Sequence, residues 1–301
     1  MNQPMRNYLS VGLISFMAYP KTMGGEGPIL ESIRRIAADD YFDAIEISWI
    51  KDPKTRREAA RILAQSRLWV GYGGQPRLLT TGLNLNDLDP AGRERAVQTM
   101  LEGIDEAYEM GASGFGFLSG KYEEEKKEQA LEALTDSVSR MCRHAARKGD
   151  MKVLLEVFDY DVDKRSLIGP APLARQFAKA MAKEPNFGLI IDLSHFPLLH
   201  ETVREAVIPV REFVRHAHMG NAVTTPGLPG YGDQHPRFGF PGGKNDAAEL
   251  AAYLRALLEI GYLRENKPGI VSFEVKPFEG EDPEIVIANA KRTLNQAWAM
   301  V

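Results

Sequence analysis

The stretch Ile190-Ile191-Asp192-Leu193-Ser194-His195 is a short apolar run that ends on a carboxylate, with a histidine three residues later. Three other segments are likewise short strand-like runs that end on a metal-type ligand: Leu154-Leu155-Glu156, Val214-Arg215-His216-Ala217-His218 and Val271-Ser272-Phe273-Glu274. Each run has the length of a buried strand, and helical patterns separate one run from the next. Apolar strands that alternate with helices are typical of a parallel sheet covered by helices.

The same alternation extends over the whole chain. The predicted strands are Leu9–Met17, Asp43–Trp49, Leu68–Gly73, Gly114–Leu118, Val153–Phe158, Gly188–Leu193, Phe213–His218 and Ile270–Val275. The predicted helices are Pro28–Ala38, Lys54–Ser66, Ala91–Met110, Lys121–Arg147, Ala171–Ala182, Glu201–Val207, Asp246–Glu259 and Pro283–Met300. This order, without a break in composition, predicts an α/β fold in which residues 1–301 form a single (β/α)8 TIM barrel domain.

Composition limits the possible partners. A chain of 301 residues with 44% apolar and 26% charged residues is typical of a soluble globular protein. The net charge of −4 gives no excess of cations for nucleic acid, so we expect no nucleic-acid partner. Cys142 is the one cysteine, which excludes a disulfide within the chain and favours a reducing compartment. Without a long apolar run or a signal-like start, we expect a cytoplasmic protein with no membrane contact.

In such a barrel the carboxyl ends of the strands meet at one mouth, where active sites lie. We therefore expect Glu156, Asp192, His218 and Glu274 to come together there. Three carboxylates packed together repel one another strongly unless a cation lies among them. Oxygen ligands with a single imidazole suit Mn²⁺, Mg²⁺ or Co²⁺. The sequence thus predicts a divalent metal site with these four residues as ligands.

Other polar residues are candidates for supporting roles. Glu46 lies in the second strand and is expected to orient a ligand or substrate. His216 points to the same face of its strand as His218, so one of the two can bind the ion while the other donates to a carboxylate below it. His195 either contacts a substrate hydroxyl or a metal-bound water, or caps a turn. His144 and His200 are expected at the surface.

The stretch Gly220–Asn245 follows the seventh strand and is too long for a tight connection. Loops of this length are often lids or binding loops, so we expect a lid over the mouth. This loop carries His235 and Arg237, which we predict to bind substrate. Its glycine-rich part, Gly239-Phe240-Pro241-Gly242-Gly243, lacks the Gly-Lys-Ser/Thr ending of a phosphate loop.

Glu156, Asp192-x-x-His195, His216-Ala-His218-Met-Gly220 and Glu274, at the ends of the fifth to eighth strands, resemble the xylose-isomerase-like superfamily. Within it the chain resembles the sugar phosphate isomerase/epimerase family, which includes the ketose 3-epimerases. The resemblance implies a small-molecule sugar substrate and a divalent metal cofactor, most often Mn²⁺. It implies that Glu156 and Glu274 are both ligands and acid/base catalysts, and that a cis-enediolate forms after proton abstraction.

Two positions depart from the ketose 3-epimerases. Thr224 stands where those enzymes carry an arginine, and Val162 replaces a substrate-binding acid. These two differences suggest that the substrate is a bulkier or conjugated sugar rather than a free ketose. The larger subunit of C-glycoside deglycosidases, a lyase that cleaves a carbon–carbon bond of 3-keto C-glycosides beside a small β-rich subunit, is an alternative on similar chemistry. Inosose dehydration is another.

Two further classes of function are less consistent with the sequence. A phosphodiesterase of the endonuclease-four type needs more histidines and a surface that accepts DNA. A non-catalytic scaffold is expected to lose ligands, and all four candidates are present. We expect a homo-oligomer, or a hetero-oligomer with the small β-rich subunit if the protein is a C-glycoside deglycosidase.

Overall fold

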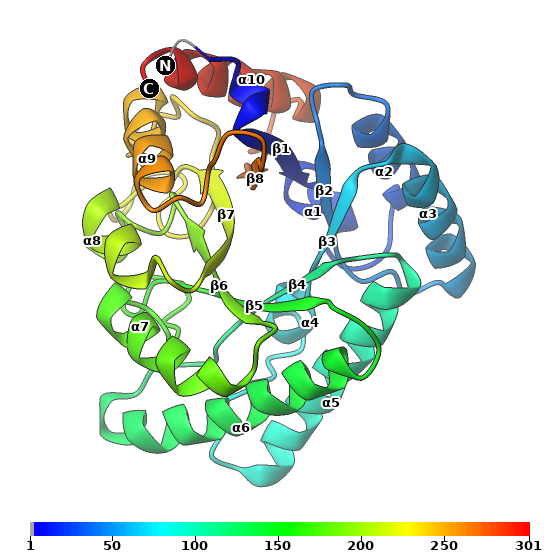
Figure 1. Ribbon diagram of the computed structural model, residues 1–301, viewed down its shortest axis with the longest axis vertical. Helices are drawn as coiled ribbons and strands as arrows, with labels where there is room; N and C mark the ends of the chain where they lie inside the picture. The colour runs from blue at the N-terminus through cyan, green and yellow to red at the C-terminus, as the bar shows by residue number, and fades with distance from the viewer. Residues whose placement is uncertain (1–2) are drawn as a thin grey trace.

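The computed structural model describes residues 3–301 and forms a closed barrel of parallel strands in the order β1 to β8. Figure 1 shows this ring of strands with most helices outside it. The two end segments are in contact, because the Trp298 indole donates to the backbone oxygen of Gln3. The strands are β1 Leu9–Ile14, β2 Ala44–Ile47, β3 Trp69–Gly73, β4 Gly114–Leu118, β5 Lys152–Glu156, β6 Phe187–Asp192, β7 Val214–Gly220 and β8 Gly269–Glu274. The predicted (β/α)8 barrel is confirmed.

Most of the helices cover the outside of the barrel, and two short ones, which begin at Ser15 and Gln75, lie at the carboxyl ends of β1 and β3. The helices are α1 Ser15–Ala18, α2 Ile29–Ala37, α3 Pro53–Ser66, α4 Gln75–Leu79, α5 Pro90–Glu109, α6 Lys127–Ala146, α7 Ala171–Ala180, α8 Val203–Val207, α9 Ala247–Glu259 and α10 Pro283–Ala299. None of the helices in residues 3–301 is long and apolar enough to cross a membrane. Cys142 is buried within α6, at the position that the helical pattern predicts.

The sequence Asp-Pro begins three of the long helices. Asp52, Asp89 and Asp282 each accept hydrogen bonds from backbone N–H groups of the first turn, and the proline that follows stands in that turn. An aspartate cap satisfies amide donors that have no partner in the helix, and proline lacks the donor that would otherwise be left unpaired. These three helix starts are therefore encoded locally.

The first predicted strand, Leu9–Met17, is too long. Strand β1 ends at Ile14, the last residue that pairs with β2, and residues 15–18 form α1. The Ser15 hydroxyl donates to the backbone oxygen of Glu46, which turns the chain away from the sheet. A short apolar run has the same composition in a buried strand and in a buried helix, so the pattern could not place this end.

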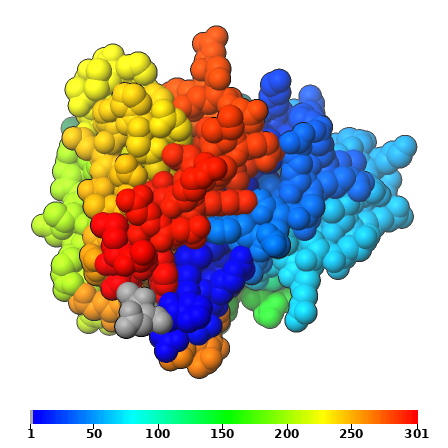
Figure 2. Space-filling view, turned by 90° about the horizontal axis from the view of Figure 1, so that it is seen from above, coloured from blue at the N-terminus to red at the C-terminus, as the bar shows by residue number. Residues whose placement is uncertain are grey.

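The loop after β7 is pinned at both of its ends. The Asn221 side chain accepts a hydrogen bond from the backbone N–H of Asn245, and the Asn245 side chain donates to the backbone oxygens of Leu193 and Gly220. In Figure 2 this loop, in yellow, and the orange-red segment after β8 lie at one end of the molecule. The orange turn before β8 lies at the opposite end. The loop thus borders the mouth, and its movement as a lid stays a prediction.

Candidate functional site

Four side chains meet at the carboxyl end of the barrel. Glu156, Asp192 and Glu274 are the last residues of β5, β6 and β8, and His218 lies near the end of β7. One ligand atom from each lies within 4.8 Å of the others, and all four residues are buried. The register of the parallel strands explains this, because Asp192 pairs with His218 and Gly220 pairs with Glu274. Residues up to about 120 positions apart are therefore brought to one point.

The two ring nitrogens of His218 face different partners. Nδ1 lies 3.1 Å from Oε1 of Glu156 and 2.9 Å from Oε2 of Glu274. Nε2 lies 3.2 Å from Oε2 of Glu46. Nδ1 therefore points into the carboxylate cluster, and Nε2 points down into the barrel.

Glu46 connects two histidines below the cluster. Its Oε1 lies 2.7 Å from Nε2 of His216, and its other oxygen contacts His218. His216 stacks in turn on the ring of Trp69, with 5.3 Å between the ring centroids. The expectation that one histidine of the pair lies lower and contacts a carboxylate agrees with these distances.

Asp192 is held rigidly by the turn that follows β6. Its carboxylate accepts hydrogen bonds from the backbone N–H and the hydroxyl of Ser194. His195 lies 3.6 Å from the same carboxylate and is fully buried. Its Nδ1 is 2.8 Å from the backbone oxygen of Val157, which makes Nδ1–H the donor. His195 therefore packs behind the cluster.

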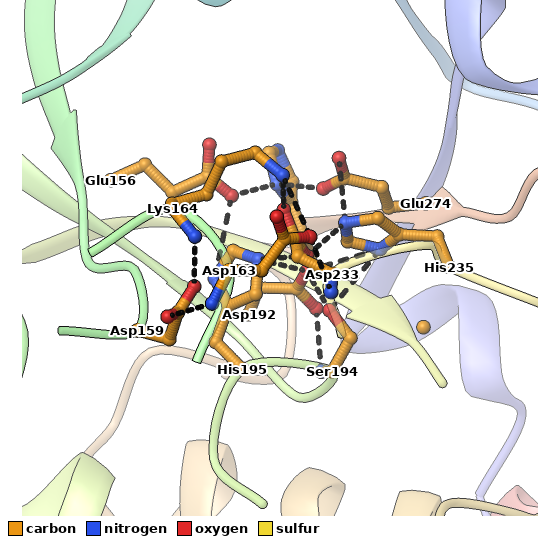
Figure 3. Close-up of polar contacts among 12 residues, drawn as sticks. Glu156, Asp159, Asp163, Lys164, Asp192, Ser194, His195, Asp233, His235 and Glu274 are labelled. Carbon is orange, nitrogen blue, oxygen red and sulfur yellow. Dashed lines mark hydrogen bonds and ion pairs between the residues drawn. The ribbon is translucent and has the colours of Figure 1, made fainter. Parts of the chain in front are cut away.

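A second charged group lies beside the cluster and is centred on Asp233 (Figure 3). The Asp233 carboxylate lies 2.7 Å from Nζ of Lys164, 3.0 Å from His195 and 2.7 Å from Nε2 of His235. His235 also lies 3.5 Å from Glu274. The loop after β7 thus supplies two side chains to the site, and the loop after β5 supplies the lysine.

Asp159 sets the position of that lysine. Its buried carboxylate accepts hydrogen bonds from the backbone N–H groups of Val162, Asp163 and Lys164 at 2.6–2.8 Å. One side chain therefore folds the whole turn after β5. The turn then directs the ammonium group of Lys164 toward Asp233.

Burial and neighbouring charges act against each other on these groups. Burial favours the neutral forms, but Glu46 and Glu156 hold the pKa of His218 well above its usual range. Glu46 itself has a pKa well below its usual range, because the two histidines outweigh its burial. For Glu274, burial and the nearby Glu156 raise the pKa.

The Asp233 group shows the same competition. Burial raises the pKa of Asp233, but His235, Lys164 and His195 outweigh it and hold that pKa well below its usual range. Burial lowers the pKa of His235, but Glu274 and Asp233 outweigh it and raise the pKa to about 9. The group is therefore a compact set of opposite charges.

A cavity of about 190 Å³ opens above the cluster. Its floor is polar and carries Glu46, Glu156, His218, Glu274 and His235. Its walls are largely apolar and include Ile14, Phe16, Met17, Met23, Pro76, Leu79 and Phe158. Lys164 and Lys276 add two cations at its edge. A small polar molecule with an apolar part matches this lining.

Other predicted residues lie elsewhere. Arg237 donates to Glu281 at 2.8 Å and does not line this cavity. His200 is exposed, and His144 is only partly exposed and lies beside Asp105. Among the predicted substrate-binding residues, His235 faces the cavity, and His195 lies behind the carboxylates.

Three residues near the cluster were not singled out as site residues by the sequence. The side-chain amide of Gln75, at the start of α4, donates to Oε2 of Glu156 at 2.7 Å. Lys164 and Asp233 form the ion pair described above. The sequence Gln75-Pro76 after a glycine pair is a signal for a helix start, and it could have predicted α4 and thereby Gln75.

The four-residue cluster fits a divalent cation. Oε2 of Glu274 is buried and has no hydrogen-bond partner in the described residues, although it lies 2.9 Å from the His218 ring. A buried carboxylate oxygen without a partner is energetically costly. Three carboxylates and the imidazole nitrogen that faces them supply the donor set of a hard or borderline ion. Glu156, Asp192, His218 and Glu274 could therefore hold a metal ion.

Fold and cluster together define a class of protein, a TIM barrel with buried carboxylate and imidazole groups at the carboxyl ends of its strands. The family model described as xylose isomerase-like TIM barrel matches residues 34–296. The chain belongs to that family. Among curated proteins, none matches the chain significantly in sequence.

Solved structures share the fold at low sequence identity. The D-psicose 3-epimerase from Clostridium cellulolyticum H10 has a TM-score of 0.70 and 17% identity, with 97% of this chain and 99% of that chain covered. The IolI protein with a zinc atom has a TM-score of 0.74 and 16% identity at the same coverage. The 3-keto-D-glucoside 4-epimerase from E. coli has a TM-score of 0.65 and 17% identity, again at that coverage.

Proposed function

We propose that this protein is a divalent-metal-dependent isomerase or epimerase of a keto-sugar, with Mn²⁺ as the preferred ion and Mg²⁺ or Co²⁺ as substitutes. One observation carries the proposal: Glu156 and Glu274 approach His218 from two strands at the base of the cavity. Sugar epimerases among the proteins of similar fold support the same reaction class.

The proposed ligands are Glu156, Asp192, His218 and Glu274. A bound divalent ion would offset most of the negative charge of the three carboxylates and polarise a substrate carbonyl. The remaining chemistry belongs to the side chains. One glutamate removes the proton from the carbon next to the carbonyl, which leaves an enediolate, and a carboxyl group returns a proton to a carbon of that enediolate. Return from the opposite face at the same carbon gives the epimer, and return at the neighbouring carbon gives the isomer.

The surrounding residues hold the two glutamates in place. Gln75 donates to Glu156, which fixes the direction of the carboxylate. Glu46 contacts His218 from below. His235, Lys164 and Lys276 line the cavity and are proposed to bind the hydroxyl groups of the sugar, because each supplies a donor there. His195 is proposed to orient Asp233 and Asp192.

The apolar wall of the cavity indicates which class of keto-sugar would bind. Phe16, Met17 and Leu79 offer little to a free sugar whose hydroxyl groups point outward. A keto-sugar that carries an apolar substituent would bury that part against the wall. The test therefore compares free ketoses with 3-keto-glycosides.

The deciding experiment is solvent exchange. The metal-loaded protein is incubated in D₂O with each sugar, and NMR records the epimer or isomer together with deuterium at the exchanged carbon. Glu156→Gln and Glu274→Gln are each expected to lower the rate by at least about a hundredfold, because general acid–base groups contribute that much. Glu279→Gln, an exposed glutamate near β8, is the matched control and should retain the wild-type rate.

Three outcomes would refute the proposal. Product formed without deuterium incorporation would exclude proton exchange with a solvent-equilibrated carboxyl group. Near-normal exchange in either glutamine variant would exclude that glutamate as the acid/base group. Release of an apolar aglycone without any epimer would assign the protein to the lyases.

A further inference from the structure

A second cavity lies at the opposite end of the barrel from the carboxylate cluster. Trp69, Gly114, Lys152, Val214 and Gly269, each the first residue of a strand, line it. Its volume is about 680 Å³, which is in the range of small-molecule sites. Because a strand rises about 3.3 Å per residue, β3 alone places some 13 Å between this cavity and the mouth.

Five cations surround this cavity. They come from three separate segments: Lys152 at the start of β5, Arg211 and Arg215 before and within β7, and Arg264 and Lys267 before β8. None of the five forms an ion pair with any residue in 3–301. Two carboxylates, Asp150 and Glu212, also line it. Cations are in clear excess here although the whole chain carries a net charge of −4.

These five cations are set apart because they converge on one cavity, since many other lysines and arginines in residues 3–301 also lack an ion pair while the rest are paired. Arg140 and Arg143, for example, are paired with Glu94 and Glu184. Unpaired like charges that converge on a concavity raise the local potential and attract anions. Three of the five are arginines, Arg211, Arg215 and Arg264, whose planar guanidinium groups suit a phosphate better than a simple point charge does.

Glycines hollow the barrel interior at this end. A Cβ atom at Gly71 would lie 2.7 Å from the Trp69 ring, and one at Gly114 would lie 3.1 Å from it. A Cβ at Gly188 would lie 2.3 Å from the aliphatic part of Arg215. TIM-barrel interiors are usually filled by large branched side chains. Here small residues let an indole ring and an arginine stem occupy the floor of the cavity.

We infer that this cavity is a binding site for a small organic phosphate. The phosphate group binds among Lys152, Arg211, Arg215, Arg264 and Lys267, and the organic part packs on the half-buried Trp69 ring. The inference does not depend on the proposed isomerase activity, since it concerns other residues at the other end of the barrel.

Calorimetry tests the site with probes that separate the phosphate from the organic part. Glucose 6-phosphate, ATP and inorganic phosphate are titrated into the wild-type protein at low ionic strength. At least one organic phosphate is expected to bind with a Kd below about 1 mM, and about tenfold or more tighter than inorganic phosphate. Raising NaCl to 0.5 M should weaken binding about tenfold, since salt screens exposed charges.

Variants locate the site. Arg215→Gln combined with Arg264→Gln should weaken binding at least about tenfold, since two charge-assisted hydrogen-bonding groups are lost. Arg140→Gln combined with Arg143→Gln removes the same charge elsewhere and should bind like wild type. Wild type is expected to change its tryptophan fluorescence when the ligand binds, and Trp69→Phe should abolish that change. Circular dichroism confirms that each variant is folded.

Several results would overturn the inference. The first is no binding of any organic phosphate at about 10 mM, tenfold above the expected limit. The second is equal affinity for inorganic and organic phosphate. The third is unchanged binding in the variant that lacks Arg215 and Arg264. Binding of double-stranded DNA that organic phosphates fail to displace would assign the surface to a macromolecule instead.

Discussion

Replacement of Glu46 by glutamine tests the support beneath the proposed metal site. Glu46 is buried and accepts from both His216 and His218. Glutamine keeps the shape of the side chain but has one acceptor oxygen. Its NH₂ group must therefore face one of the two imidazole N–H groups, and the negative charge is lost. His218 then loses the partner that directs Nδ1 toward Glu156 and Glu274.

The expected loss of Mn²⁺ affinity follows from the contact between Glu46 and His218. One hydrogen bond to a charged group contributes roughly 1.5–3 kcal/mol. Loss of such a partner behind a metal-binding histidine lowers metal affinity by about 10- to 100-fold. The two ranges agree, because 1.4 kcal/mol corresponds to about a factor of ten. Glu46→Gln should therefore bind Mn²⁺ about 10- to 100-fold more weakly than wild type, while its fold persists.

The assay is competition for Mn²⁺ between the metal-free protein and a chromophoric chelator at fixed pH. Glu279→Gln removes one exposed negative charge in the segment after β8 and controls for the general electrostatic effect. Thermal unfolding confirms that both variants are folded. An affinity within twofold of wild type for Glu46→Gln, or an equal loss in both variants, would refute the reasoning.

Three further predictions concern other parts of the chain. Arg77→Met should lower the free energy of unfolding in urea by about 3 kcal/mol, because it leaves the buried Glu106, 2.6 Å away, without its main partner. Arg140→Ala, at an exposed pair, should cost less than about 1 kcal/mol, and a larger loss there than at Arg77 would contradict the comparison. Cys142, whose pKa is raised to about 12 by burial, should resist a thiol reagent in the native protein and react fully after unfolding; rapid labelling of the native protein would contradict its burial. The pKa of Asp233 is depressed in the folded protein, because its cationic neighbours outweigh its burial, so its contribution to stability is present above the unfolded pKa of about 3.9 and is lost as the pH falls through the folded value. Asp233→Asn should accordingly be less stable than wild type at pH 6, and the difference should shrink below about pH 4; a difference that grows on acidification would contradict this sign.

The sequence predicted the parts of the site that depend on strand geometry. Parallel strands of a barrel end at one mouth, so acidic residues at the ends of β5, β6 and β8 had to converge with His218 once the strands were placed. No knowledge of side-chain packing was needed for that step. The strand ends were located to within about two residues, except for β1.

Among the residues that depend on loop conformation, the sequence singled out His235, which lines the cavity, but not Lys164 or Asp233. Lys164 reaches the site only because the Asp159 carboxylate folds the turn after β5. Asp233 and His235 enter together, yet Arg237, two residues further along the same loop, pairs with Glu281. Periodicity carries no information about such turns, since each is fixed by individual hydrogen bonds.

The interior of the barrel shows why these features belong together. Three layers lie along its axis: the carboxylates with His218, then Glu46 with His216, then the Trp69 ring. Branched apolar residues would give a more stable interior, because buried charges lose hydration even when they are paired. Glu46, Glu156 and Glu274 each have an imidazole within about 3 Å, and Asp192 has two at 3.6–3.7 Å, so removing one member leaves another buried and unpaired. Replacing all of these charged residues by apolar ones would remove the cost of burying charge, but it would also remove the atoms proposed to bind the metal ion. The polar interior is therefore best explained by its support of the proposed metal ligands at the mouth.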